Sequence, residues 1–159
     1  MTTLNEIRSH HPCQDGWAKL LKHLNKNSAD DEPLSLLTVL ASNGLDDAIW
    51  CLRTEPEPER TQRFALAVAR RVQHLHPQAE ATLDIVERYL HGQATKKELD
   101  VARYAAADCA AAEAAARCAV GDHAAAHAAC LSYATNAATD AANAAEREAQ
   151  AQIFREIFA

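Results

Sequence analysis

One tract in the second half of this sequence is about half alanine, and it limits the possible folds more than any other feature. The tract runs from Val101 to Ala151, and Gly121 is its one clear helix breaker. Alanine has the highest helix propensity of all residues, so the tract predicts helices for local reasons alone. We expect two long helices, roughly Lys96 to Val120 and His123 to Phe158.

The packing of these helices is less obvious, because an alanine side chain buries little apolar area. What alanine permits is a close approach of helix axes, so that dispersion contacts replace the interdigitation of bulky side chains. We therefore expect an antiparallel helical hairpin that packs against the helices carrying Phe64 and Leu83. Four apolar residues near the end of the chain should anchor the last helix, either on this bundle or on a second copy of the chain. These are Ile153, Phe154, Ile157 and Phe158.

The remainder of the chain also predicts helices. Four glycines and five prolines are too few for a β sandwich or barrel, in which a turn is needed about every 8–12 residues. We expect an all-α, compact multi-helix bundle in two parts. Residues 1–54 form a subdomain of short helices, and residues 55–159 form the alanine-rich bundle that ends in the long helical hairpin.

Local signals place several helix ends. Capping boxes, in which a threonine and a glutamate three residues later satisfy free backbone N–H groups, begin at Thr3 and at Thr95. Pro12 and Pro33 suit the first position of a helix. Gly44 suits a helix stop, because glycine readily adopts a positive φ.

Three further helices are expected in the middle of the chain. One begins at Asp46, a second begins near Glu59, and a third runs from Gln78 to His91. The second is rich in arginine, which we assign to its outer face. These arginines are Arg60, Arg63, Arg70 and Arg71.

The charge balance excludes several classes of partner. Sixteen Lys and Arg against 22 Asp and Glu give a net charge of −6, and the chain has no cluster of basic residues for binding nucleic acid directly. No apolar stretch is long enough to span a membrane, and the N-terminus carries no signal-peptide pattern. Five cysteines, an odd number without a CxxC pair, suit reduced thiols. We therefore expect a soluble, cytoplasmic protein.

The excess acid lies in short runs that have two interpretations. Carboxylates are common in solvated loops and at helix N-termini, where they complement the helix dipole. They can also form a surface that attracts a basic partner protein. The candidate partner-binding residues are Asp30, Asp31, Glu32, Asp46, Asp47, Glu55, Glu57 and Glu59.

Few residues indicate catalysis. His123 and His127 are spaced i, i+4 and could hold a divalent metal with Asp122 or Cys130, but three alanines stand where a zinc protease motif carries its glutamate. They are weak metal candidates, and we expect no cofactor. The sequence also lacks phosphate-binding glycine loops and the GxSxG elbow of serine hydrolases. A non-catalytic protein is favoured, and a metal- or thiol-dependent enzyme that uses the two histidines is an alternative.

Two parts of the sequence resemble known proteins. The segments PCQDGW, ADDEPL and GLDDAIWCLR, which start at Pro12, Ala29 and Gly44, are similar to the opening of uncharacterised proteins from bacteriophages and proteobacteria. From Arg63 through GQAT at residues 92–95 and into the alanine-rich tract, the chain resembles the immunity protein family found beside polymorphic toxins. That family implies an all-α fold and an inhibitory role, and it offers no catalytic residues to transfer.

The resemblance and the charge together give an expected function. We expect an inhibitor that binds stoichiometrically to a partner protein with a basic functional surface, such as a nuclease. The partner is a toxin if the protein acts as an immunity protein. If the gene is phage-borne, the partner is a bacterial defence effector, as for an anti-CRISPR protein. A structural homodimer that pairs through its alanine face is a further alternative.

Overall fold

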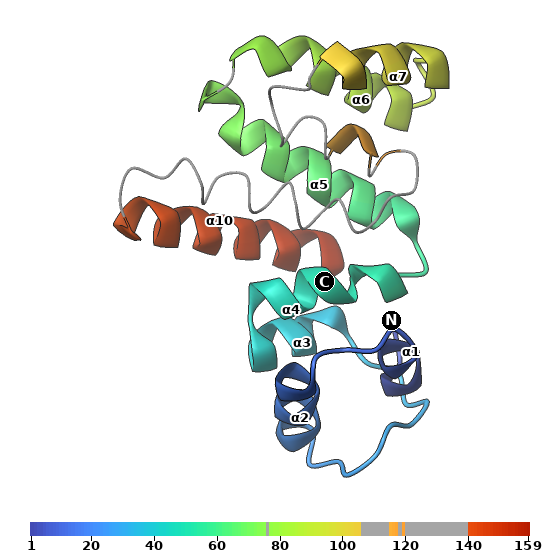
Figure 1. The fold of residues 1–159 in the computed structure, drawn as a ribbon, viewed down its shortest axis with the longest axis vertical. Helices are drawn as coiled ribbons and strands as arrows, with labels where there is room; N and C mark the ends of the chain where they lie inside the picture. Colours follow the sequence, from blue (N-terminus) through green and yellow to red (C-terminus); the bar gives the residue numbers. More distant parts are fainter. Residues whose placement is uncertain (76, 106–114, 118, 120–139) are drawn as a thin grey trace. The chain divides into compact units, whose positions relative to one another are not determined.

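The computed structural model describes most of the chain, and the regular secondary structure of these residues is helical apart from one isolated antiparallel bridge between Thr2 and Leu34 (Figure 1). The expected all-α class is therefore confirmed. No helix in the described part of the chain is long and apolar enough to span a membrane. The described residues are 1–75, 77–105, 115–117, 119 and 140–159.

The first of two compact units comprises Met1–Pro56 and Phe158–Ala159. Large aliphatic side chains form its core, in which Ala48 is the one alanine among the buried apolar residues that the structure describes. Because isolated short helices are unstable in water, packing rather than length must hold these elements. The elements are α1 (Leu4–Ser9), α2 (Gln14–His23), α3 (Leu36–Asn43), α4 (Leu45–Trp50) and the 3-10 helix η1 (Cys51–Thr54).

Side-chain caps set the helix starts in this unit. Thr3 and Glu6 form the expected capping box, in which Glu6 N donates to Thr3 Oγ1 (3.1 Å) and Thr3 N donates to Glu6 Oε2 (2.9 Å). The expectation that Pro12 occupies a first helical position is wrong. Helix α2 begins after Cys13, whose Sγ accepts a hydrogen bond from Gly16 N (3.4 Å). The cysteine therefore takes the capping role that an oxygen usually has.

The expectation that Pro33 starts a helix is also wrong, because extended backbone follows it. Thr2 N donates to Leu34 O (2.9 Å), and Leu34 N donates to Thr2 O (2.7 Å). Helix α3 begins only after Ser35, whose hydroxyl oxygen accepts a hydrogen bond from a backbone N–H of the first turn (3.2 Å). The bridge and the serine cap together outweigh the preference of proline for a helix start. Helix α3 stops as expected at Gly44, whose φ of 99° favours glycine.

The second unit, Glu57–Ile157, contains the longer helices. The expected capping box at Thr95 is present, since Glu98 N donates to Thr95 Oγ1 (3.2 Å) and Thr95 N donates to Glu98 Oε2 (2.7 Å). The helix expected from Gln78 begins at Glu80, after a 3-10 turn. The elements are α5 (Pro58–Val72), the 3-10 helices η2 (Gln73–Leu75) and η3 (Pro77–Ala79), α6 (Glu80–Leu90), α7 (Lys96–Ala105) and α10 (Asp140–Phe158).

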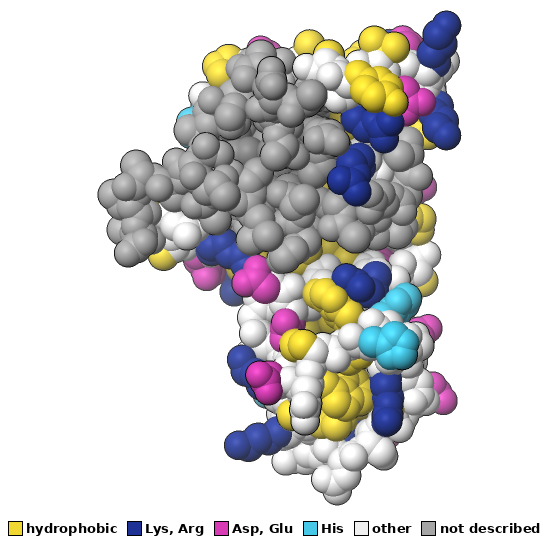
Figure 2. Space-filling view, viewed as in Figure 1, with side chains coloured by type: hydrophobic (Ala, Val, Ile, Leu, Met, Phe, Trp, Pro, Cys, Tyr) yellow, Lys and Arg dark blue, Asp and Glu magenta, His cyan; other side chains and the backbone are white. Residues whose placement is uncertain are grey.

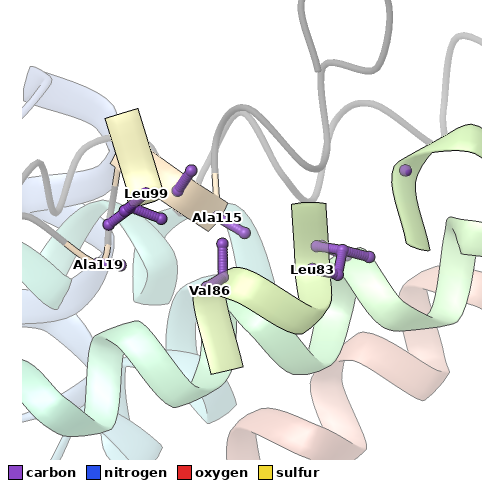
Figure 3. Close-up of a cluster of buried hydrophobic side chains, with 8 residues drawn as sticks. Leu83, Val86, Leu99, Ala115 and Ala119 are labelled. Carbon is purple, nitrogen blue, oxygen red and sulfur yellow. The ribbon is translucent and has the colours of Figure 1, made fainter. Parts of the chain in front are cut away.

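Part of the alanine-rich tract enters the core of this unit. Three of its alanines are at most 4% exposed and cluster with Leu83 and Val86 of α6 and Leu99 of α7 (Figure 3). They are Ala115, Ala116 and Ala119. This packing agrees with the expected contact between the tract and the helix that carries Leu83. Much of the expected hairpin, Lys96–Val120 with His123–Phe158, lies outside the described residues, and so the hairpin stays a prediction.

An aromatic contact anchors α10 within the second unit. Phe154 and Phe64 of α5 are fully buried, and their rings meet edge to face with centroids 5.3 Å apart and planes at 82°. Arg60 on α5 also donates from Nη2 (2.6 Å) and Nε (3.0 Å) to Ile157 O. Of the two expected anchoring modes, the structure therefore shows docking on this chain's own bundle.

Candidate protein-binding site

The first acidic run lies in the loop between α2 and α3 and is partly neutralised. Lys26 Nζ forms ion pairs with Asp30 and with Glu32 (2.7 Å). Its hydrogen bond to Asp30, followed by the one to Glu32, raises the pKa of Lys26, and the same hydrogen bond from Lys26 lowers the pKa of Asp30. Asp31 accepts a hydrogen bond from Asn5 Nδ2 (2.8 Å), which ties the loop to α1. This run therefore presents less negative charge than its sequence suggests.

The second acidic run forms the first turn of α4. Asp46 is exposed and Asp47 is half-buried, and both carboxylates complement the positive end of the helix dipole. Asp47 Oδ2 accepts a hydrogen bond from Asn43 Nδ2 (2.7 Å). Asp47 forms no ion pair with the residues that the structure describes. The Asp47 carboxylate is therefore positioned by the neutral side-chain amide of Asn43.

The third acidic run is divided between the two units. Glu55 is only 9% exposed, which corrects its assignment to an accessible acidic surface. Glu57 and Glu59 are exposed but belong to the second unit. Glu59 lines a hollow there beside Arg63 and Arg70. Six of the eight predicted acidic residues therefore belong to the first unit and two to the second. Figure 2 shows both acidic and basic side chains among the described residues of the face that it draws.

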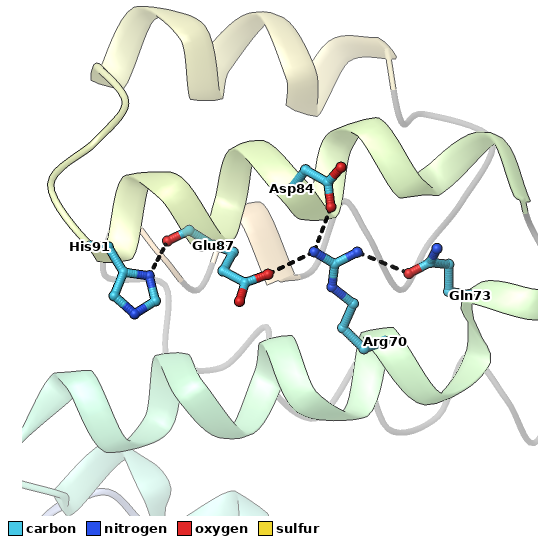
Figure 4. Close-up of polar contacts among 5 residues, drawn as sticks. All are labelled: Arg70, Gln73, Asp84, Glu87 and His91. Atoms are coloured by element: carbon cyan, nitrogen blue, oxygen red, sulfur yellow. Dashed lines mark hydrogen bonds and ion pairs between the residues drawn. The ribbon is translucent and has the colours of Figure 1, made fainter.

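The arginines of α5 form the expected outer face only in part: Arg63 and Arg71 are exposed, but Arg60, Arg70 and Arg71 also contact neighbouring helices. Arg70 Nη2 donates to Asp84 Oδ1 (2.7 Å) and to Glu87 Oε2 (2.8 Å), which ties α5 to α6 (Figure 4). Partial burial lowers the pKa of Arg70, but the hydrogen bonds to the two carboxylates outweigh it and raise this pKa overall. Arg71 binds the buried carboxylate of Glu146 on α10 through three hydrogen bonds of 2.8–3.1 Å. These side chains hold helices together instead of facing a partner.

The histidine candidates His123 and His127 lie outside the described residues, as do Asp122 and Cys130. Within the described ranges, no group of three or more His, Cys, Asp and Glu side chains is arranged to hold a metal ion. The metal hypothesis therefore stays a prediction from the i, i+4 spacing alone.

The first unit contains an apolar pocket that the sequence did not reveal. It has a volume of about 100 Å³ and is lined by residues of α1, α2, α3, α4 and η1. Both tryptophans of the chain, Trp17 and Trp50, line it, together with Leu20 and Val39. Periodicity assigns Trp17 to the packing stripe of α2, and no local motif links it to Trp50 on α4. Only the tertiary structure brings the two indoles to one site.

One part of the pocket lining is polar and tightly fixed. Asn43 Nδ2 donates to Asp47 Oδ2 (2.7 Å) and to Gly16 O (2.8 Å). A β-carbon at Gly16 would lie 2.8 Å from Asp47 Oδ2 and 3.0 Å from Cys13 Sγ, so this close approach requires glycine. The second carboxylate oxygen, Asp47 Oδ1, accepts no hydrogen bond from the described part of the chain. It is the acceptor that a ligand could use.

Two thiols also line the pocket, and they differ in environment. Burial raises the pKa of Cys51 to about 12, with a smaller contribution from the negative charge of Asp47. Cys51 is therefore a neutral thiol at pH 7 and a poor nucleophile. Cys13 is exposed at the N-cap of α2. The pocket lining that the structure describes brings no histidine beside either thiol.

Comparisons of this chain with family models, with curated proteins and with solved structures found no match. The resemblance to immunity proteins therefore stays a prediction. The described residues by themselves define an all-α protein with an apolar pocket that carries two indoles and a carboxylate.

Proposed function

We propose that this protein is a non-catalytic inhibitor that binds a partner protein stoichiometrically through its first unit. The observation that carries the proposal is the apolar pocket beside Asp47, in the same unit as the exposed carboxylates of Asp31 and Asp46. Protein interfaces combine buried anchors with a polar rim, and complementary charge speeds the encounter of the partners. The pocket supplies a site for an anchor, and the carboxylates supply the charge.

The proposed partner has a basic functional surface. It is a toxin that is neutralised in the manner of an immunity protein, or a bacterial defence effector that a phage-borne protein of the anti-CRISPR kind inhibits. In this proposal the second unit is a scaffold stiffened by its arginine ion pairs and by the expected alanine-rich hairpin. Cys13 and Cys51 are free thiols, which suits the expected location in the cytoplasm.

A titration of the partner's activity tests this proposal. The partner is first captured on the immobilised protein from a host lysate, identified and purified. We expect its activity to fall linearly and to vanish at one equivalent of the protein. Loss of activity at a small fraction of an equivalent would indicate an enzyme, and no loss at an excess would remove the inhibitor class.

Charge reversal tests the contribution of the first unit. We expect Asp31→Lys with Asp46→Lys to slow association about tenfold at low salt and to weaken its salt dependence. Glu156→Lys, an exposed reversal of the same sign on α10 that changes the net charge half as much, is the control and should leave the rate within about twofold. Equal association rates for both variants would contradict steering by the first unit.

A further inference from the structure

We infer that the pocket of the first unit binds a lysine side chain of the partner. The methylene chain lies along the indole walls of Trp17 and Trp50, and the ammonium group binds Asp47 Oδ1. That the lysine belongs to a partner protein rests on the proposed function. That the ligand is an alkylammonium group rests only on the residues of the pocket.

The size of the pocket restricts its occupant. An apolar cavity of about 150 Å³ holds one benzene molecule, and the volume here is about 100 Å³. The pocket therefore suits one unbranched aliphatic chain and is too small for an indole or a nucleotide. Trp17, Trp50, Leu20 and Val39 give it walls on which methylene groups can be buried.

The charge of the pocket selects a cation. None of the described residues that line it is Lys, Arg or His, and Asp47 contributes a half-buried carboxylate that forms no ion pair within the same described ranges. A purely apolar occupant would cover part of the Asp47 carboxylate without giving it a hydrogen bond, which is unfavourable. An anion would be repelled. A long side chain with an apolar stem and a cationic head satisfies both the walls and the carboxylate.

The hydrogen bonding of the carboxylate favours lysine over arginine. A guanidinium binds a carboxylate best through two parallel hydrogen bonds, one to each oxygen. Here Asn43 already donates to Asp47 Oδ2, and this amide is itself fixed by its second bond to Gly16 O. One oxygen remains, which suits the single-point contact of an ammonium group.

Two cations of the first unit lie beside pocket residues without lining the pocket. The guanidinium of Arg53 lies over the ring of Trp50, 3.9 Å from its centroid, which shows that this indole accepts a cation on its face. Lys19 Nζ donates to the backbone oxygen of Asn43 (3.4 Å) and is exposed. The pocket therefore stays open to a cation from outside.

Titration with n-butylammonium tests the pocket without any partner protein. We expect saturable NMR shifts of the indole N–H groups of Trp17 and Trp50 and of the Asn43 side-chain amide, with a dissociation constant on the order of millimolar. The isosteric neutral probe n-butanol should bind at least fivefold more weakly. Equal binding of the two probes, or shifts that do not saturate, would overturn the inference.

Matched variants assign the binding to Asp47. Asp47→Asn should weaken n-butylammonium binding at least fivefold, while Asp46→Asn, in the same helical turn but outside the pocket lining, should change it less than twofold. Gly16→Ala is a second variant, because its methyl group must displace the Asp47 carboxylate. It should also weaken binding. Unchanged affinity in both pocket variants, with folding verified by circular dichroism, would contradict the assignment.

The identified partner then tests the source of the lysine. In a double-mutant cycle, we expect Asp47→Asn to weaken the affinity for the natural partner, but not for a partner in which one particular surface lysine is replaced by alanine. If no partner lysine couples to Asp47, the pocket does not bind the partner in this way, whatever the outcome of the activity titration. Because n-butylammonium needs no partner, failure of the pocket and failure of the proposed function remain separate results.

Discussion

The two units have cores of different kinds, although both are built only from helices in the described residues. In the first unit, large residues such as Leu4, Ile7 and Leu52 are almost fully buried. In the second unit, seven of the buried apolar residues that the structure describes are alanine, and ion pairs such as Arg71 with Glu146 connect the helices. The first unit therefore depends on large side chains almost throughout its core, whereas the second combines large side chains such as Phe64 and Phe154 with positions where a small side chain is packed.

The candidate pocket lies in the unit with the bulkier core. Short helices with bulky side chains of unequal shape fit together less regularly, and in the first unit they leave the pocket beside Trp17 and Trp50. Alanine at a helix contact allows the backbones to approach and leaves little room to fill. We therefore expect a smaller side chain to destabilise the core of the first unit and a larger one to destabilise the alanine contacts of the second.

The largest expected effect is the loss of a bulky side chain in the first unit. Leu52→Ala should lower the free energy of unfolding by about 2–5 kcal/mol, because Leu52 is 1% exposed and its removal leaves a cavity. Tryptophan fluorescence in a urea titration measures this change, since both tryptophans lie in the first unit. A loss below about 1 kcal/mol would mean that this core does not depend on volume.

The opposite change should harm the second unit. Ala116→Leu should cost about 1–3 kcal/mol, because the alanine is fully buried and a larger side chain must displace its neighbours. Circular dichroism in urea measures the loss. Ala144→Leu, exposed on α10, is the matched control and should change stability by no more than about 0.5 kcal/mol. Equal effects of the two leucines would contradict a core that depends on small residues.

The ion pair of the buried Glu146 with Arg71 should contribute more to stability than the exposed pair of Glu148 with Arg155 on α10. Glu146→Gln should cost about 1–2 kcal/mol, less than for a fully buried pair because the Arg71 side chain is 43% exposed and can be hydrated. Glu148→Gln is the control: Glu148 is 72% exposed and pairs with Arg155 at 2.9 Å, so its loss should be within about 0.5 kcal/mol. Urea titrations of both variants compare the two pairs directly.

The capping boxes should contribute alike, whatever the core. Thr3→Ala in the first unit and Thr95→Ala in the second should each cost about 1 kcal/mol, because each removes the acceptor for a backbone N–H of the first helical turn. Amide hydrogen exchange of α1 and α7 measures the two losses separately. If only one of the two substitutions lowers stability, the contribution of a cap depends on the core of its unit and not on the helix end alone.

The smallest effect concerns acid stability. Hydrogen bonds from the backbone N–H and then the hydroxyl of Thr95 lower the pKa of Glu98. A lowered pKa in the folded state means that the carboxylate stabilises the fold above its ordinary pKa, and that this contribution disappears as the pH falls through the lowered value. The melting temperature of Glu98→Gln should therefore depend less steeply on pH between about 5 and 3 than that of the natural chain. Identical slopes would contradict this assignment.

Local features of this fold could be predicted from the sequence, because their causes lie within one helical turn. The boxes at Thr3 and Thr95 and the stop at Gly44 each depend on residues three or four positions apart. The helix start predicted at Pro33 was wrong, because the backbone after this residue pairs with Thr2, which is far away in the sequence. No local pattern contains that contact.

The candidate site was harder to predict for the same reason. Acidic runs could be read from the sequence, but the burial of Glu55 and the ion pairs of Lys26 depend on tertiary contacts. Arginine on α5 was assigned to solvent because it is charged, whereas Arg70 finds carboxylates on the next helix. The pocket is lined by residues of five helices, so no local pattern could predict it. The local feature that points to it is Gly16, because a glycine in the first turn of a helix can indicate a close contact.

The pairing of Thr2 with Leu34 also decides how the N-terminus can be engineered. A purification tag joined before Met1, which is 66% exposed, leaves both backbone hydrogen bonds of the pair in place. Trimming the chain to begin at Leu4 would delete one half of the pair and the cap of α1 together. The loop that carries Asp30 to Glu32 would then lose the backbone hydrogen bonds that fix it just before α3. Faster protease cleavage within this loop would detect that loss.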